Sequence, residues 1–319
     1  MASWERCRHS CRATPPSPSL PFPPALSPAL DSFCYRCQFV TDDWALALDL
    51  DSMRSSHPIQ VEVHSADQVS EIFDAISYYK GASVIRSVFD WIGEEAFQKG
   101  LQAYLLKFSY ANTVTDDLWD AWGAASGKPV KEVMGSWTLQ TGYPLLTVEE
   151  AEGGMLKVAQ QRFLKDGSEG EGLWRVPVAV RGSDPSSKAY TMLESAEGLV
   201  PMPPGSAWVK VNPSQTGVYR VRYSPSLLHK LQPGVPSLTT GDRIGLVGDA
   251  FALATAGLTP VVDVLHFLLG FVDETDYTVT TVAAMPQHPL ALVQSLLRGK
   301  KKHPLALVRV APLRAEPLP

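Results

Sequence analysis

The chain has 319 residues, of which 45% are hydrophobic and 19% charged, and its formal net charge is −5. This composition is typical of globular proteins, and it argues against wholesale disorder and against a strongly basic nucleic-acid-binding surface. The length allows two domains, or three small ones.

Residues 1–37 form a segment of unusual composition. Seven prolines fall between Pro15 and Pro28, which predicts an extended, disordered leader. The leader contains all four cysteines of the chain: Cys7, Cys11, Cys34 and Cys37. Four thiolates could hold zinc, but 22 residues rich in proline separate the two pairs, and we favour cysteines with no joint role.

The leader also bears on the location of the protein. Its first 30 residues carry Arg and Ser and few acids, which indicates a transit peptide as one alternative and an untargeted leader as the other. No export signal follows Met1, so we expect a cytoplasmic protein. The most apolar long stretch, residues 250–271, is interrupted by Pro260 and Asp263, and we predict no membrane span.

Residues 38–142 have the apolar spacing of helices. Ile72 and Phe73, and then the apolar positions from Val84 to Ile92, recur at helical intervals. Thr115 has the character of an N-cap before a helix that ends at Gly127, and a further helix begins at Pro129.

From residue 143 to 223 the period changes to two, and clusters of Gly, Ser, Asp and Pro separate the apolar runs. These short strands predict a small antiparallel β-sandwich. Their expected ranges are 145–148, 156–158, 174–180, 207–211 and 217–221.

Helical periodicity returns over residues 224–279, with starts expected at Gly241-Asp242 and Thr259-Pro260. Residues 280–319 carry six Lys or Arg and one Glu and contain two copies of His-Pro-Leu-Ala-Leu-Val. We predict a basic, poorly ordered tail there. The fold class predicted for the whole chain is α+β and multidomain, with disordered ends.

The absence of several catalytic motifs limits the reactions that the chain could catalyse. It contains no His-Glu-x-x-His, no Gly-x-Ser-x-Gly and no Walker-type loop. Tyr78 is a candidate, because a phenol at the start of a helix can donate a hydrogen bond to an oxyanion in a cleft. The alternative is a tyrosine packed in the core with its hydroxyl bonded to the backbone.

Several stretches resemble one family. They include Ser77-Tyr78-Tyr79-Lys80-Gly81 and Trp137-Thr138-Leu139-Gln140-Thr141-Gly142-Tyr143-Pro144, and the similarity extends, more loosely in its later part, over residues 38–279. The chain resembles the zinc aminopeptidases of the gluzincin type, such as the puromycin-sensitive enzyme and aminopeptidase N.

The resemblance implies an architecture. Residues 38–142 would be the helical end of a thermolysin-like catalytic domain, residues 143–223 a β-sandwich, and residues 224–279 the start of a C-terminal α-helical superhelix. By the same resemblance, Tyr78 would stabilise the oxyanion formed at the zinc. Phe73 would line the pocket for the first side chain of the substrate, or else pack in the core.

The family's zinc ligands and general base lie in motifs that this sequence does not contain. We therefore expect a fragment of a zinc metallo-aminopeptidase that binds no zinc and is inactive alone. Its expected partners are peptide substrates, as in the family, and a full-length homologue, with no nucleic acid. Both ends of the chain have the composition of a splice product or of translated non-coding sequence.

Two other interpretations remain open. The chain could be a non-enzymatic module that binds peptides or a homologue through an exposed helical face bearing Trp91, Trp119, Trp122 and Trp137. It could also be an erroneous gene product whose helices 71–140 lack a partner, leaving residues 143–223 as the only stable core.

Overall fold

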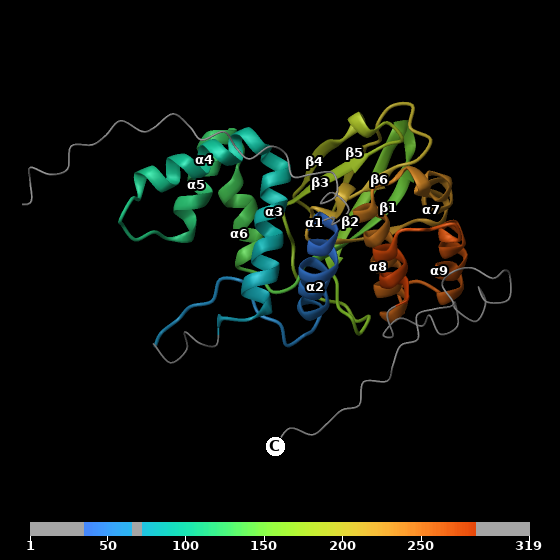
Figure 1. The fold of residues 1–319 in the computed structure, drawn as a ribbon, viewed down its shortest axis with the longest axis horizontal. Coiled ribbons are helices and arrows are strands. Elements are labelled where there is room, and N and C mark those ends of the chain that lie inside the picture. The colour runs from blue at the N-terminus through green and yellow to red at the C-terminus, as the bar shows by residue number, and fades with distance from the viewer. Residues whose placement is uncertain (1–34, 66–71, 285–319) are drawn as a thin grey trace, which may run out of the picture. The chain divides into compact units, whose positions relative to one another are not determined.

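The computed structural model describes residues 35–65 and 72–284, which form a helical part, two β-sheets and a second helical part in chain order (Figure 1). Most of the predicted leader, with Cys7, Cys11 and Cys34, and most of the predicted basic tail lie outside the described residues. Cys37 is described, and its side chain is buried in the core.

Helices make up most of the first part. A π-helical segment, η1, follows α1 directly, and a second one, η3, leads into α3. The elements are α1 (Tyr35–Gln38), η1 (Phe39–Trp44), α2 (Ala45–Asp51), η3 (Ile76–Lys80), α3 (Gly81–Ile92), α4 (Glu94–Lys107), α5 (Thr115–Ser126) and α6 (Val130–Thr138).

The predicted cap at Thr115 and the helical spacing at Phe73 both differ from the structure. Thr115 is the first residue of α5 and not its cap, because the Asp117 carboxylate reaches back and accepts a hydrogen bond from the backbone N–H of Val114 at 2.9 Å. Phe73 precedes the helical segment, which begins at Ile76. Gly127 ends α5 in the left-handed conformation, as predicted, with φ of 67°.

The four tryptophans expected on an exposed helical face are buried, so that expectation is wrong. Trp119 and Trp122 lie side by side with ring centroids 5.5 Å apart, and Phe97 stacks on Trp122. Trp91 is 7% exposed. Trp137 faces Trp174, which lies just before β3 (Val176–Arg181), and donates a hydrogen bond to the Arg175 carbonyl at 3.1 Å. Helix–helix and helix–sheet packing within this chain therefore covers them.

Among residues 35–65 and 72–284, seven strands form two sheets. The four-stranded sheet has the order β5-β2-β1-β7 and the three-stranded sheet the order β4-β3-β6. The strands are β1 (Pro144–Ala151), β2 (Met155–Arg162), β3 (Val176–Arg181), β4 (Ala189–Leu193), β5 (Glu197–Pro201), β6 (Lys210–Val211) and β7 (Arg220–Tyr223).

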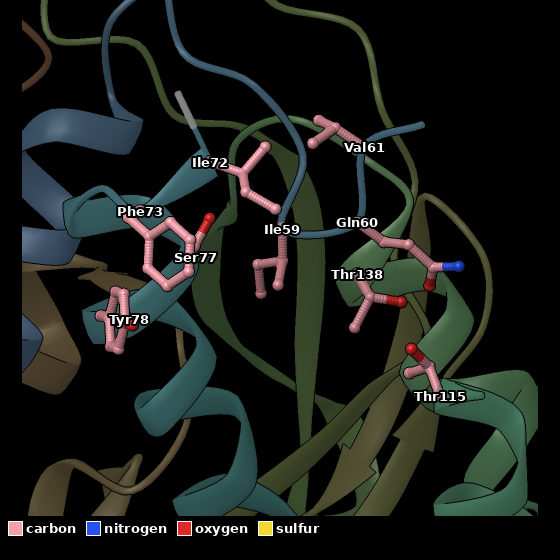
Figure 2. Close-up of a pocket in the computed structure, with 9 residues that line it drawn as sticks. All are labelled: Ile59, Gln60, Val61, Ile72, Phe73, Ser77, Tyr78, Thr115 and Thr138. Carbon is pink, nitrogen blue, oxygen red and sulfur yellow. The ribbon is translucent and has the colours of Figure 1, made fainter. Parts of the chain in front are cut away.

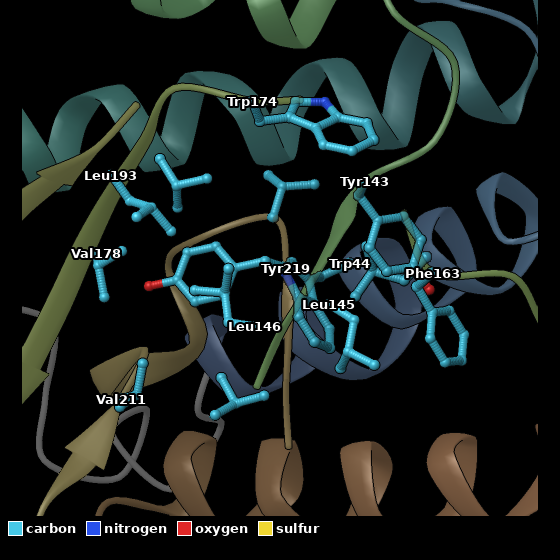
Figure 3. Packing of buried hydrophobic residues seen from close by; sticks show 14 of the residues in the cluster. Trp44, Tyr143, Leu145, Leu146, Phe163, Trp174, Val178, Leu193, Val211 and Tyr219 are labelled. Carbon is cyan, nitrogen blue, oxygen red and sulfur yellow. The ribbon is translucent and has the colours of Figure 1, made fainter. Parts of the chain in front are cut away.

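The predicted strands coincide largely with β1, β2 and β3, the one expected at 217–221 is displaced from β7, and the set is incomplete elsewhere. Strands β4 and β5 were not expected, and β6 is only two residues long. The first sheet is mixed and not purely antiparallel, because β1 and β7 run parallel, with Leu146 opposite Val221. Tyr219, Leu145 and Leu146 meet under Trp174 in the core (Figure 3).

The second helical part follows β7 directly. Its elements are α7 (Pro225–Leu231), η7 (Gln232–Ser237), α8 (Thr240–Thr255), α9 (Val261–Leu268), η8 (Leu269–Phe271) and α10 (Tyr277–Ala284). Thr239 caps α8 by a reciprocal pair of hydrogen bonds with Asp242. Thr259 and Pro260 immediately precede α9, close to the predicted start.

Polar contacts join the first helical part to the sheets. Asp90 on α3 accepts hydrogen bonds from Lys188 at 2.6 and 2.7 Å and from Thr216 at 2.7 Å, and it also accepts one from the Tyr190 hydroxyl. These charge-assisted bonds lower the pKa of Asp90 even though burial opposes the shift. Across residues 35–65 and 72–284, no helix combines the length and the apolar character that a membrane span requires.

Candidate functional site

Tyr78, the tyrosine singled out from the sequence, is exposed at the start of the second π-helical segment. Its side chain is 57% exposed, and that of Phe73 is 62% exposed. The two rings lie side by side with centroids 6.1 Å apart. The core-packing alternative is therefore wrong for both residues.

Tyr78 and Phe73 form one wall of a pocket of about 380 Å³ (Figure 2). The opposite wall carries Gln60, Thr115 and Thr138, which come from the loop after α2, from α5 and from α6. The lining residues bear no formal charge, and the remaining ones are Ile59, Val61, Ile72 and Ser77. The pocket can therefore offer neutral hydrogen-bonding groups and apolar contacts to a ligand.

A buried ion pair holds the helix that carries Tyr78. Lys80 Nζ lies 2.8 Å from Asp51 Oδ2, and both side chains are fully buried. Lys80 also donates hydrogen bonds to the carbonyls of Gly142 at 2.9 Å and Gln140 at 3.3 Å. The Asp51 carboxylate accepts bonds from the Gly142 N–H at 3.0 Å and from Ser56 Oγ at 2.6 Å.

These contacts connect the two motifs that carried the family resemblance. Lys80 belongs to the first, and Gly142 to the second. Burial lowers the pKa of Lys80, and Asp51 opposes that shift through its charge and hydrogen bond. The pair thus fixes η3 against the chain that leads from α6 into β1.

A second pair joins the two sides of the pocket. His57 lies on the loop that continues to Gln60, and its Nε2 donates to Asp74 Oδ2 at 2.5 Å. The other oxygen of Asp74 accepts a hydrogen bond from the Ser77 N–H at 2.9 Å, next to Tyr78. His57 Nδ1 donates to the Pro58 carbonyl at 2.8 Å.

Both imidazole nitrogens of His57 thus have acceptors, which favours the charged ring. Burial lowers the pKa of His57, but the hydrogen bonds to Asp74 and Pro58 outweigh it and raise the pKa above 6.5. The pKa of Asp74 is lowered despite its partial burial, because Ser77 and His57 donate to its carboxylate.

The described residues do not fit a zinc ion. Nowhere in residues 35–65 and 72–284 do three or more His, Cys, Asp or Glu side chains gather in a way that could hold a metal. His57 uses both ring nitrogens in the contacts above. A zinc site of three protein ligands therefore has no candidate set beside Tyr78.

Comparison with known proteins defines the class. Residues 25–137 match the peptidase family M1 domain, and residues 208–288 match the ERAP1-like C-terminal domain. These two matches confirm the predicted resemblance to the zinc aminopeptidases over the matched parts of the chain.

Its relatives are aminopeptidases by name. Aminopeptidase M1-A of Oryza sativa subsp. japonica is 42% identical over 239 residues, which is 72% of this chain and 27% of the relative. Aminopeptidase M1 of Arabidopsis thaliana is 41% identical over 255 residues, or 75% and 29%. The puromycin-sensitive aminopeptidase of Caenorhabditis elegans is 39% identical over 256 residues, or 76% and 27%. The chain thus spans less than a third of the length of these relatives.

Sequence reasoning singled out Tyr78 and Phe73 as candidates but gave no role to the residues that hold their segment in place. Asp51, His57 and Asp74 were given no role, although each is a charged or titratable residue next to a segment of the family resemblance. The available signal was Lys80, a charge inside the resemblance motif at a position that α3 and its neighbours bury.

Proposed function

We propose that the chain supplies the oxyanion-stabilising tyrosine and part of the substrate pocket of a zinc metallo-aminopeptidase, an enzyme that removes N-terminal residues from peptides. In this proposal Tyr78 donates its hydroxyl hydrogen to the developing oxyanion, and Phe73 contacts the first side chain of the substrate. The observation that supports it best is the exposure of Tyr78 at a pocket, on a helix that a buried ion pair holds.

The same proposal holds that this polypeptide does not hydrolyse peptides by itself. When bound, zinc lowers the pKa of its water ligand to about 7 and so supplies the nucleophile. The described residues do not fit the ion, and the sequence contains no His-Glu-x-x-His. A tyrosine can stabilise negative charge, but it cannot generate the attacking hydroxide near neutral pH.

Metal content and hydrolysis test the inactivity. The purified 319-residue protein should contain much less than one zinc per chain by elemental analysis, and it should not cleave an aminoacyl-anilide. Hydrolysis that co-purifies with the protein and is abolished by a chelator would contradict this part of the proposal.

The role of Tyr78 is tested in a chimera, because the reaction needs the rest of the enzyme. Residues 38–279 would replace the matching segment of the C. elegans relative. Tyr78→Phe should lower kcat by about 10²–10³, the usual cost of losing one oxyanion donor, with zinc content unchanged. The neighbouring half-buried Tyr79, changed to Phe, is the matched control and should leave kcat nearly unchanged.

Equal losses of activity for both tyrosine variants would overturn the assignment, since the effect would then be structural. A loss for Tyr78→Phe alone, with the urea midpoint retained, would support it.

The finer architecture belongs to this proposal as well. We assign residues 38–142 to the end of a thermolysin-like domain, 143–223 to a β-sandwich and 224–279 to the start of an α-helical superhelix. A cytoplasmic location and peptide substrates follow from the same assignment. The binding-module alternative relied on exposed tryptophans, and their burial removes its main support.

A further inference from the structure

A second cavity, of about 470 Å³, lies where the two helical parts meet the four-stranded sheet. Its walls come from η1 and α2 on one side and from α8 on the other. Arg220 contributes from β7, and Phe163 from the residue that follows β2. Its volume falls within the range of small-molecule sites, which often form where structural units join. It shares no lining residue with the pocket beside Tyr78.

Arg220 is the polar group that distinguishes this cavity. Its side chain is 8% exposed, and its position is fixed by two contacts. Nε donates to the Tyr143 hydroxyl at 3.2 Å, and Nη1 donates to Asp249 Oδ1 at 3.1 Å. Within the part of the chain that the structure describes, no residue accepts a hydrogen bond from Nη2. Arg220 lines the cavity, so its Nη2 group can donate a hydrogen bond to a ligand there.

Aromatic rings flank this guanidinium. Its central carbon lies 5.8 Å from the Trp44 ring centroid and 5.6 Å from that of Phe163. The Trp44 indole is fixed in turn, because Nε1 donates to the Gly217 carbonyl at 3.0 Å. Trp44 and Phe163 lie near each other at one end of the core cluster (Figure 3). The site therefore combines flat apolar surfaces with a donor that is already oriented.

The charges around the cavity favour a neutral ligand over an anion. Arg220 is balanced by Asp249, and Lys165 at the rim pairs with Asp49 at 2.5 Å. The remaining charged lining residue is Asp42, an exposed carboxylate that would repel an anion.

We propose that this cavity binds a small, uncharged, largely apolar molecule. Its carbonyl oxygen, or an equivalent acceptor, accepts a hydrogen bond from Arg220 Nη2. The site is separate from the pocket beside Tyr78, so the inference does not depend on the proposed function. The ligand is defined by its chemistry: an apolar body of a size that fits the cavity, and one hydrogen-bond acceptor.

Gly248 on α8 provides a way to fill the cavity without disturbing Arg220. It lines the cavity, and a Cβ placed on it meets no atom within 4 Å. Gly248→Leu should therefore be accommodated by the fold while its side chain occupies the ligand space. Ala252→Leu, one turn further along α8, fills the same cavity and serves as the second variant. Gly135→Ala on α6, whose Cβ first meets Leu139 at 4.0 Å, is the control.

The probe is an uncharged dimethylaminonaphthyl methyl ketone, whose emission shifts to the blue in apolar surroundings. It should bind the full chain with one-to-one saturation. Gly248→Leu should weaken binding at least tenfold, and Gly135→Ala should not. A competitor with CH₂ in place of the carbonyl should bind about tenfold more weakly, a difference of ~1.4 kcal/mol.

Several results would overturn the inference: no saturable binding, equal binding by the carbonyl-free competitor, or tighter binding of the naphthoate anion. Retention of binding by a folded cavity-filling variant would do the same. If circular dichroism shows that Gly248→Leu is unfolded, Ala252→Leu gives the same test.

Discussion

Replacing Lys80 by Met tests whether the buried ion pair holds the Tyr78 helix. Lys80 and Asp51 are fully buried, and Asp51 Oδ2 receives no hydrogen bond from another described residue. The variant would leave that oxygen facing an apolar methionine and would also remove the donor to the Gly142 and Gln140 carbonyls. Breaking a buried pair by removing one partner costs about 3–5 kcal/mol.

This cost is a large share of the ~5–15 kcal/mol by which domains are stable. With a urea m-value of ~2 kcal/mol/M, a loss of ~4 kcal/mol lowers the unfolding midpoint by about 2 M. Urea unfolding followed by circular dichroism measures it directly. The double variant Asp51→Asn/Lys80→Met should be less destabilised than the sum of the single changes, because neither charge is then left buried alone.

The matched control is Lys99→Met. Lys99 pairs with Glu95 one helical turn away at 2.6 Å, but the side chains of both residues are mostly exposed. Solvent screens such exposed pairs, so they contribute little to stability. The reasoning is refuted if Lys80→Met and Lys99→Met shift the urea midpoint equally, or if the double-variant cycle shows no coupling.

Two further predictions concern the pocket loop and helix packing. Because the pKa of His57 is raised and that of Asp74 lowered, their pair is worth most between about pH 4 and 6.5 and is lost as pH rises through the pKa of the folded His57. His57→Gln should therefore destabilise the protein by ~0.5 kcal/mol at pH 6 and by less at pH 8.5, and equal losses of urea stability at both pH values would contradict this. Gly100→Ala should cost about 1–3 kcal/mol, because its Cβ would lie 2.5 Å from Trp122 Cδ1. Gly123→Ala, whose nearest contact is 3.4 Å, is the control, and thermal melts that do not separate the two glycine variants would refute the packing argument.

Local sequence patterns predicted much of the secondary structure. Apolar spacing located the helix that buries Val84, Val88 and Ile92, and alternation located β1 and β2. The same patterns missed β4 and β5, in which a single residue of each strand is buried. Without an apolar face, a short strand carries little alternating signal, and pairing with a neighbour decides its existence.

Sequence motifs also revealed the resemblance to the zinc aminopeptidases and singled out Tyr78, since motifs depend on residue order alone. Which side chains are exposed was a different matter. The tryptophans of α3, α5 and α6 have the helical spacing of either a core or an exposed face, and contacts with distant residues such as Trp174 bury them. Tyr78 and Lys80 are two positions apart, yet one faces solvent and the other is fully buried. Only long-range packing makes that difference, because Asp51 and Gly142 reach Lys80 from segments far away in the chain.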